Sequence, residues 1–213
     1  MTATDITGGK VLDIARWQPH ARTRLEAAAL DLFDERGYEA TTAAEIAARA
    51  DLTERTFFRH FADKREVLFA NEDTMLAALV AGVREAPDDR LSVPDLVRAG
   101  LDAVAVALQP RRDDLRRRAA IIATHPALHE RELMKQTATA ATLAQVLQER
   151  GVDATLAPLA ADVAIVALRT AFDRWIADAE RRPLSDLVTE TLDQLDRVTR
   201  APRPAAAPAT RRG

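Results

Sequence analysis

Apolar residues recur every three or four positions along most of the chain, and glycine, proline and short polar stretches separate the segments that carry this period. Such a period places apolar side chains along one face of an α-helix. No segment has the alternating pattern of a strand, so we predict an all-α fold. The helices are expected at about 19–36, 42–50, 53–61, 64–85, 92–108, 110–124, 127–150, 156–180 and 184–199.

Residues 41–64 have the capping residues and spacing of a helix-turn-helix. Thr42 with Glu45 three positions later predicts a capping box at the start of the first helix. Asp51 tolerates the left-handed backbone of a tight turn, and Thr53 is suited to cap the next helix. We therefore predict two short helices joined by a four-residue turn.

The second of these helices has two different faces at 100° per residue. Phe57 and Phe61 share one side and are expected to pack inward. The opposite side carries guanidinium groups suited to guanine or phosphate, and a carboxylate suited to cytosine. We interpret it as a surface that reads DNA, whereas surface ion pairing of the two arginines with Glu54 or Asp63 is the alternative. This side is formed by Glu54, Arg55, Phe58 and Arg59.

The aromatic residues divide the chain into two unequal parts. Seven of the nine lie in the first 70 residues, and the other two are Phe172 and Trp175. The chain after residue 70 is rich in alanine, leucine and valine. Two hydrophobic cores of different composition are therefore expected. The predicted organisation is an N-terminal helix-turn-helix domain joined by a long helix to a larger helical domain. The ranges are a flexible arm at 1–18, the helix-turn-helix domain at 19–79, the larger domain at 80–199 and a disordered tail at 200–213.

The charge of the chain gives no general support to DNA binding. The formal net charge of the 213 residues is −3, and the first 70 residues hold 10 lysines and arginines against 12 aspartates and glutamates. Any basic footprint must therefore be local. The basic run at 110–118 also contains two aspartates, which favours a solvated helix face over a second nucleic-acid patch.

Several other kinds of chemistry are disfavoured by the residues present. Without cysteine, the chain has neither disulfides nor thiolate metal sites. His125 and His129 lie on either side of a predicted helix start, so we expect no metal site and no cofactor. The sequence lacks a glycine-rich phosphate loop and a nucleophile elbow, so no enzyme is expected. No apolar run approaches the length of a membrane span, and no secretory signal is present, so a cytoplasmic location is predicted.

Residues 23–69, TRLEAAALDLFDERGYEATTAAEIAARADLTERTFFRHFADKREVLF, resemble the TetR family of bacterial transcriptional regulators. Asp51 stands where glycine is usual in that family, and Phe58 where tyrosine is usual. The resemblance implies phosphate contacts for Thr42, His60 and Lys64, although His60 is also suited to cap a helix end. It implies a backbone contact for Thr56 and a sugar or thymine-methyl contact for Phe58. The implied base-facing residues are Thr53, Glu54, Arg55 and Arg59.

The segment at about 96–195 is similar to a TetR subgroup whose C-terminal domains bind acyl-CoA-like ligands. This similarity implies a pocket between helices, with Arg117 or Arg118 available for an anionic head group. The apolar lining expected for this pocket is Leu101, Val104, Leu108, Ile122, Leu133, Leu147 and Phe172.

The last two predicted helices, about 156–180 and 184–199, carry more apolar residues than one buried face requires. Either both form the core of a monomer or they form a subunit interface, and we expect a homodimer. The function predicted from these features is a DNA-binding regulator, a repressor released from a palindromic operator by a small apolar or acyl-CoA-like effector. The alternative is a helical lipid or acyl-ligand carrier that ignores DNA.

Overall fold

The computed structural model describes residues 20–87, 91–179 and 181–200, and every regular element in these ranges is helical. The predicted arm (1–18) lies outside these ranges, as does the predicted tail beyond Arg200. The all-α fold is confirmed. The helices are α1 (Ala21–Arg36), α2 (Ala43–Arg49), α3 (Glu54–His60), α4 (Lys64–Leu68), α5 (Glu72–Arg84), α6 (Val93–Leu108), a short 3₁₀ turn (Gln109–Arg111), α7 (Arg112–Ala123), α8 (Pro126–Glu149), α9 (Leu156–Ala177) and α10 (Leu184–Arg200).

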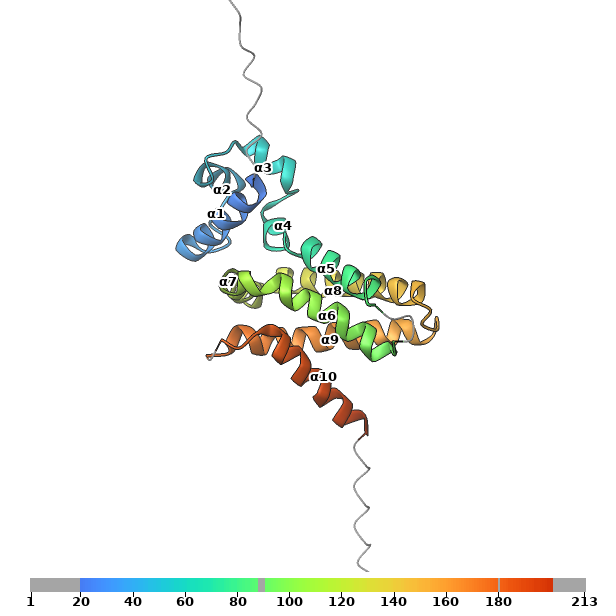
Figure 1. Ribbon diagram of the computed structural model, residues 1–213. Helices are drawn as coiled ribbons and strands as arrows, with labels where there is room; N and C mark the ends of the chain where they lie inside the picture. The colour runs from blue at the N-terminus through green and yellow to red at the C-terminus, as the bar shows by residue number, and fades with distance from the viewer. Residues whose placement is uncertain (1–19, 88–90, 180, 201–213) are drawn as a thin grey trace, which may run out of the picture.

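The N-terminal unit consists of α1 to α4 and lies at one end of the molecule, beyond the stack of α5 to α10 (Figure 1). Its core contains most of the aromatic residues of the first part of the chain, because large rings fill the few interior positions of a small helical unit efficiently. Helix α1 ends at Arg36, and the next residue, Gly37, has a φ of 84° that only glycine reaches easily. The buried rings are Phe33, Tyr38, Phe57, Phe61 and Phe69.

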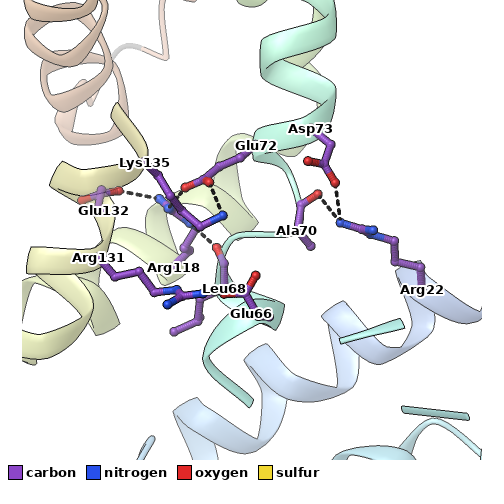
Figure 2. Close-up of polar contacts among 10 residues, drawn as sticks. All are labelled: Arg22, Glu66, Leu68, Ala70, Glu72, Asp73, Arg118, Arg131, Glu132 and Lys135. Atoms are coloured by element: carbon purple, nitrogen blue, oxygen red, sulfur yellow. Dashed lines mark hydrogen bonds and ion pairs between the residues drawn. The ribbon is translucent and has the colours of Figure 1, made fainter. Parts of the chain in front are cut away.

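The predicted single helix at 64–85 is wrong, since α4 ends at Leu68 and α5 begins at Glu72. Two backbone carbonyls at this joint accept hydrogen bonds from arginine side chains of other helices. Arg118 of α7 donates to the carbonyl of Leu68, and Arg22 of α1 donates to that of Ala70 at 3.0 Å (Figure 2). These donors compensate for helical hydrogen bonds that the break removes.

The C-terminal unit has its own core, built mainly from alanine, leucine and valine of α5, α6 and α8 to α10. Leu79 of α5 is fully buried in this second core. The two cores therefore divide near residue 70 rather than at 79. Helices α5 and α6 cross closely at Gly82 and Gly100, where a Cβ atom on Gly82 would lie 2.5 Å from the carbonyl oxygen of Ala99.

The two units also share side chains. Ile122 of α7 and Leu128 of α8 are buried in the N-terminal core although they belong to the second half of the chain. Helices α7 and α8 thus connect the C-terminal unit to the N-terminal one.

Candidate DNA-reading face and effector cavity

Helix α3 has the two faces that the sequence predicts. Phe57 is fully buried and Phe61 is 3% exposed, whereas the ring of Phe58 is 52% exposed. Thr53 caps the helix by accepting a hydrogen bond from the amide of Thr56 at 3.1 Å. In the preceding turn Asp51 adopts a φ of 51°, as the sequence predicts. Local capping and the two buried rings fix which side of α3 faces solvent.

The guanidinium groups of Arg55 and Arg59 are exposed on this outer side. Neither forms a hydrogen bond or ion pair with any residue in the described ranges. The alternative of pairing with Asp63 is not observed, because the carboxylate of Asp63 binds Arg65 at 2.5 Å and caps α4. Glu54, exposed beside them, completes a surface of charged side chains around one aromatic ring. We call Thr53, Glu54, Arg55, Phe58 and Arg59 the reading face.

The threonines near this face have local partners. Thr42 and Glu45 form the predicted capping box at the start of α2, with the amide of Thr42 donating to the Glu45 carboxylate at 2.9 Å. The hydroxyl of Thr56 is 2.9 Å from that of Thr53. Thr42 remains exposed at the N-terminus of α2, where a positive helix dipole favours an anion.

The ammonium of Lys64 is bound within the chain and does not extend into solvent toward a phosphate. It donates to the carbonyls of Tyr38 at 2.8 Å, Glu39 at 3.1 Å and Thr41 at 3.1 Å. It also lies 4.5 Å from the centroid of the Tyr38 ring. An ammonium has three N–H donors, so all of them are used within the chain. The structure therefore gives Lys64 a structural role, in which it joins α4 to the loop before α2.

His60 is half-buried at the end of α3, and its Nε2 atom is buried without a hydrogen-bond partner among the described residues. Burial lowers the pKa of this imidazole below 6.5, and the neighbouring Arg59 and Arg22 lower it further. The neutral ring is thus favoured at neutral pH. The Nε2 atom forms no helix-capping hydrogen bond with any of the described residues.

The C-terminal unit contains a cavity of about 260 Å³ between α5, α7, α8 and α9. Five of the nine residues expected at the ligand pocket line it, namely Leu108, Arg118, Ile122, Leu133 and Phe172. The apolar lining also includes Met75, Leu115, Ile165 and Leu168. Such a mixture of a large apolar surface with a few polar groups is typical of small-molecule sites.

The other four expected pocket residues do not line the cavity. Leu101, Val104 and Leu147 are fully buried within the core of the C-terminal unit. Arg117 points to α1, where it donates to Asp34 at 2.6 Å and Asp31 at 2.8 Å. The sequence does not separate these residues from those that line the cavity, because a helical period does not distinguish a side chain in close packing from one that borders a cavity.

Arg118 lines the cavity beside three charged residues that the sequence did not indicate, Glu72, Glu132 and Lys135, and Figure 2 shows the polar contacts among these four side chains. Lys135 pairs with Glu72 at 2.7 Å, and Arg118 pairs with Glu132 at 2.9 Å. Burial raises the pKa of Glu72, although Lys135 and Arg118 act in the opposite direction. Glu72 begins α5 at the joint that the sequence did not predict, which is why its place at the cavity was missed. We call Glu72, Arg118, Glu132 and Lys135 the charged wall.

The outer surface of α9 exposes several large apolar side chains. Leu156 is 43% exposed, Leu159 61% and Val166 51%. Val198 near the end of α10 is 76% exposed. Large apolar side chains exposed in this way are typical of surfaces that contact another protein.

Two further features are absent from the described ranges. These ranges contain no group of three or more histidine, aspartate or glutamate side chains arranged to hold a metal ion. None of their helices combines the length and hydropathy needed to cross a lipid bilayer.

A capped helix-turn-helix joined to a larger helical unit with a cavity is the architecture of a class of DNA-binding regulators. Comparisons with known proteins make this specific. Residues 25–70 match the family described as bacterial regulatory proteins, tetR family, and residues 91–200 match the MftR C-terminal domain. The chain belongs to the TetR family of transcriptional regulators, and its helix-turn-helix is a DNA-binding unit.

Known relatives agree with this assignment. The transcriptional regulator TcmR of Streptomyces glaucescens is 47% identical over 62 residues, a match that covers 27% of each chain and thus about a quarter of that relative. The structure of Thermus thermophilus FadR, a TetR-family repressor in complex with lauroyl-CoA, is 24% identical, with a TM-score of 0.55 and coverage of 88% of this chain and 98% of that one. A Syntrophomonas wolfei regulator has a TM-score of 0.62 at 15% identity, covering 84% and 94%. The two structures show that the fold is shared.

Proposed function

We propose that this chain is a homodimeric repressor that binds a palindromic operator and is released by a small apolar or acyl-CoA-like effector. The observation that carries the proposal is the reading face of α3. Arg55 and Arg59 extend from it without partners in the described ranges, beside the exposed ring of Phe58. Guanidinium groups presented by the second helix of a helix-turn-helix are suited to guanine edges in the major groove.

Each member of the reading face has a proposed part in recognition. Arg55, Arg59 and Glu54 contact base edges together with Thr53, and Phe58 contacts a sugar or a thymine methyl. Thr42 lies at the N-terminus of α2 and Thr56 in the first turn of α3, and both contact the DNA backbone in this proposal. His60 and Lys64 support the face from within the unit, since the ammonium of Lys64 already has three carbonyl partners.

A dimer is proposed through α9 and α10. Leu159 and Val166 are both more than half exposed on α9, and burial against a second copy would remove this apolar surface from water. Two reading faces related by a two-fold axis would then contact half-sites spaced by about one helical turn of DNA or a multiple of it. The palindromic operator follows from this symmetry.

The cavity supports the effector part of the proposal. Its apolar lining suits an alkyl or acyl chain, and FadR of Thermus thermophilus, which shares the fold, was solved with lauroyl-CoA. The Arg117 head-group contact is not part of the proposal, because Arg117 is paired with α1. The lysine and arginine residues that line the cavity are Arg118, Lys135 and Arg169.

A carrier protein would also need such a cavity to bind its ligand. Ligand binding alone does not require a reading face whose guanidinium groups point to solvent. We therefore place the chain with regulators that act on DNA in the cytoplasm, without a catalytic role. The test is binding to DNA fragments selected from a randomised library, measured with excess random DNA. Selection of a palindromic sequence supports the repressor, and failure to enrich any sequence would favour the carrier.

A further inference from the structure

The side chain of Arg118 lines the cavity and also contacts the joint between α4 and α5. This side chain is 11% exposed and lines the cavity from α7. Its Nε atom donates to the carbonyl of Leu68, the last residue of α4 (Figure 2). Its Nη1 atom donates to Glu132 at 2.9 Å, and Glu72 lies 3.7 Å from Nη2.

The joint itself is held mainly by cations that come from the C-terminal unit. The ring of Phe69 lies 5.1 Å from the guanidinium of Arg118, 5.3 Å from the ammonium of Lys135 and 5.9 Å from the guanidinium of Arg131. Arg131 also pairs with Glu66 of α4 (Figure 2). Cation–π contacts with a ring that is 3% exposed hold the position of this residue closely.

A displacement of the joint has a short path to the reading face. Helix α4 has five residues, and only residues 61–63 separate it from α3. The carboxylate of Asp63 caps α4, and Lys64 fixes the same turn to the loop before α2. A change at the Leu68 carbonyl therefore reaches α3 through one rigid helical turn.

The two kinds of surface in the cavity would make different contributions to an effector. The apolar lining gives affinity to any chain that fits, whatever its head group. An anionic group is different, because it competes with Glu132 and the Leu68 carbonyl for the guanidinium of Arg118. A neutral or cationic group does not attract this guanidinium, so Arg118 keeps its contact with α4.

Building on the repressor function proposed above, we infer that Arg118 is the positioning residue that couples the cavity to the reading face. An amphiphile with a carboxylate, phosphate or similar anionic group draws Arg118 away from Leu68 and releases DNA. An uncharged amphiphile with the same tail binds in the cavity and leaves DNA bound. The affinity of a ligand for the cavity and its ability to release DNA are therefore separate properties. The charge of the ligand determines whether DNA is released.

The first test compares octanoate, octanol and octylamine with the unmodified protein. Calorimetry measures binding of each compound, and fluorescence anisotropy measures operator affinity in its presence. At saturation octanoate should weaken operator binding about tenfold, a typical size for coupling between sites, and the other two compounds should change it less than about twofold. Equal release by octanoate and octanol would overturn the inference, as would a failure of octanoate to bind or release. Operator binding measured without any of the three compounds tests the repressor function separately.

The second test uses Arg118→Gln, because a glutamine amide can still donate to a carbonyl but does not attract an anion. Whatever the operator affinity of this variant without a ligand, octanoate should weaken that affinity no more than octanol does, because the group that responds to an anion is gone. Arg117→Gln is the matched control, since Arg117 is adjacent in sequence and pairs with Asp31 and Asp34 outside the cavity. Release that persists in Arg118→Gln would contradict the inference. If this variant does not fold, the comparison of the three compounds decides the question.

Discussion

Lys64 offers a sharp test of the difference between a structural cation and a phosphate contact. Replacement by methionine removes an ammonium that donates to three carbonyls, at 2.8, 3.1 and 3.1 Å, and keeps the length of the side chain. The bonds to Tyr38 and Thr41 are part-buried, and the bond to Glu39 is exposed. Hydrogen bonds to a charged group contribute roughly 1.5–3 kcal/mol when well shielded, and exposure reduces this value. We therefore expect Lys64→Met to lower the free energy of unfolding by about 3 kcal/mol.

Urea unfolding followed by circular dichroism measures this loss. The salt dependence of operator binding provides the second measurement, because each phosphate contact that is removed reduces its slope by about one. Lys64→Met should leave the slope unchanged at temperatures where the variant is folded. Arg65→Met is the control, since the exposed Arg65 pairs with its neighbour Asp63, and it should cost less stability. An unchanged free energy of unfolding together with a reduced slope would refute the structural role and restore Lys64 as a phosphate contact.

Four further predictions concern other parts of the molecule. Arg55→Ala should cost roughly 1–3 kcal/mol in binding at one base position of the operator, and an equal loss on random DNA would refute base reading. Because the pKa of His60 is lowered in the folded state, its contribution to stability is present above pH 6.5 and lost as the pH falls; unfolding titrations should show a weaker loss in His60→Gln. In sedimentation velocity Val166→Glu should give monomers, while Val106→Glu on the exposed side of α6 should not. Gly82→Ala should destabilise the fold by about 1–2 kcal/mol in thermal unfolding, since crowding against α6 outweighs the gain in helix propensity.

The reading face was predictable from the sequence because short-range features determine it. Thr42 and Thr53 cap their helices through residues three positions away, and Phe57 and Phe61 select the buried side of α3. All of these residues lie within the twenty positions from 42 to 61. The helix boundaries in the C-terminal unit were predictable for the same reason, since proline and glycine punctuate them.

The joint and the cavity were less predictable because contacts between distant residues create them. Arg118 is 50 residues from Leu68, and no local pattern indicates that its side chain binds the end of α4. Val104 and Leu108 lie one turn apart on α6, yet the first is in close packing and only the second borders the cavity. Both are apolar residues on the same face, so the period of the sequence assigns them alike.

Sequence-specific contact between α3 and DNA underlies the proposed repressor function. The measurement that tests it most directly is binding of the full chain to the DNA upstream of its own gene and to fragments selected from a random library, at two salt concentrations and with random DNA as competitor. We expect tight binding to a palindromic sequence that weakens with salt and persists against the competitor. Binding that the competitor abolishes, or no binding to any selected fragment, would contradict it.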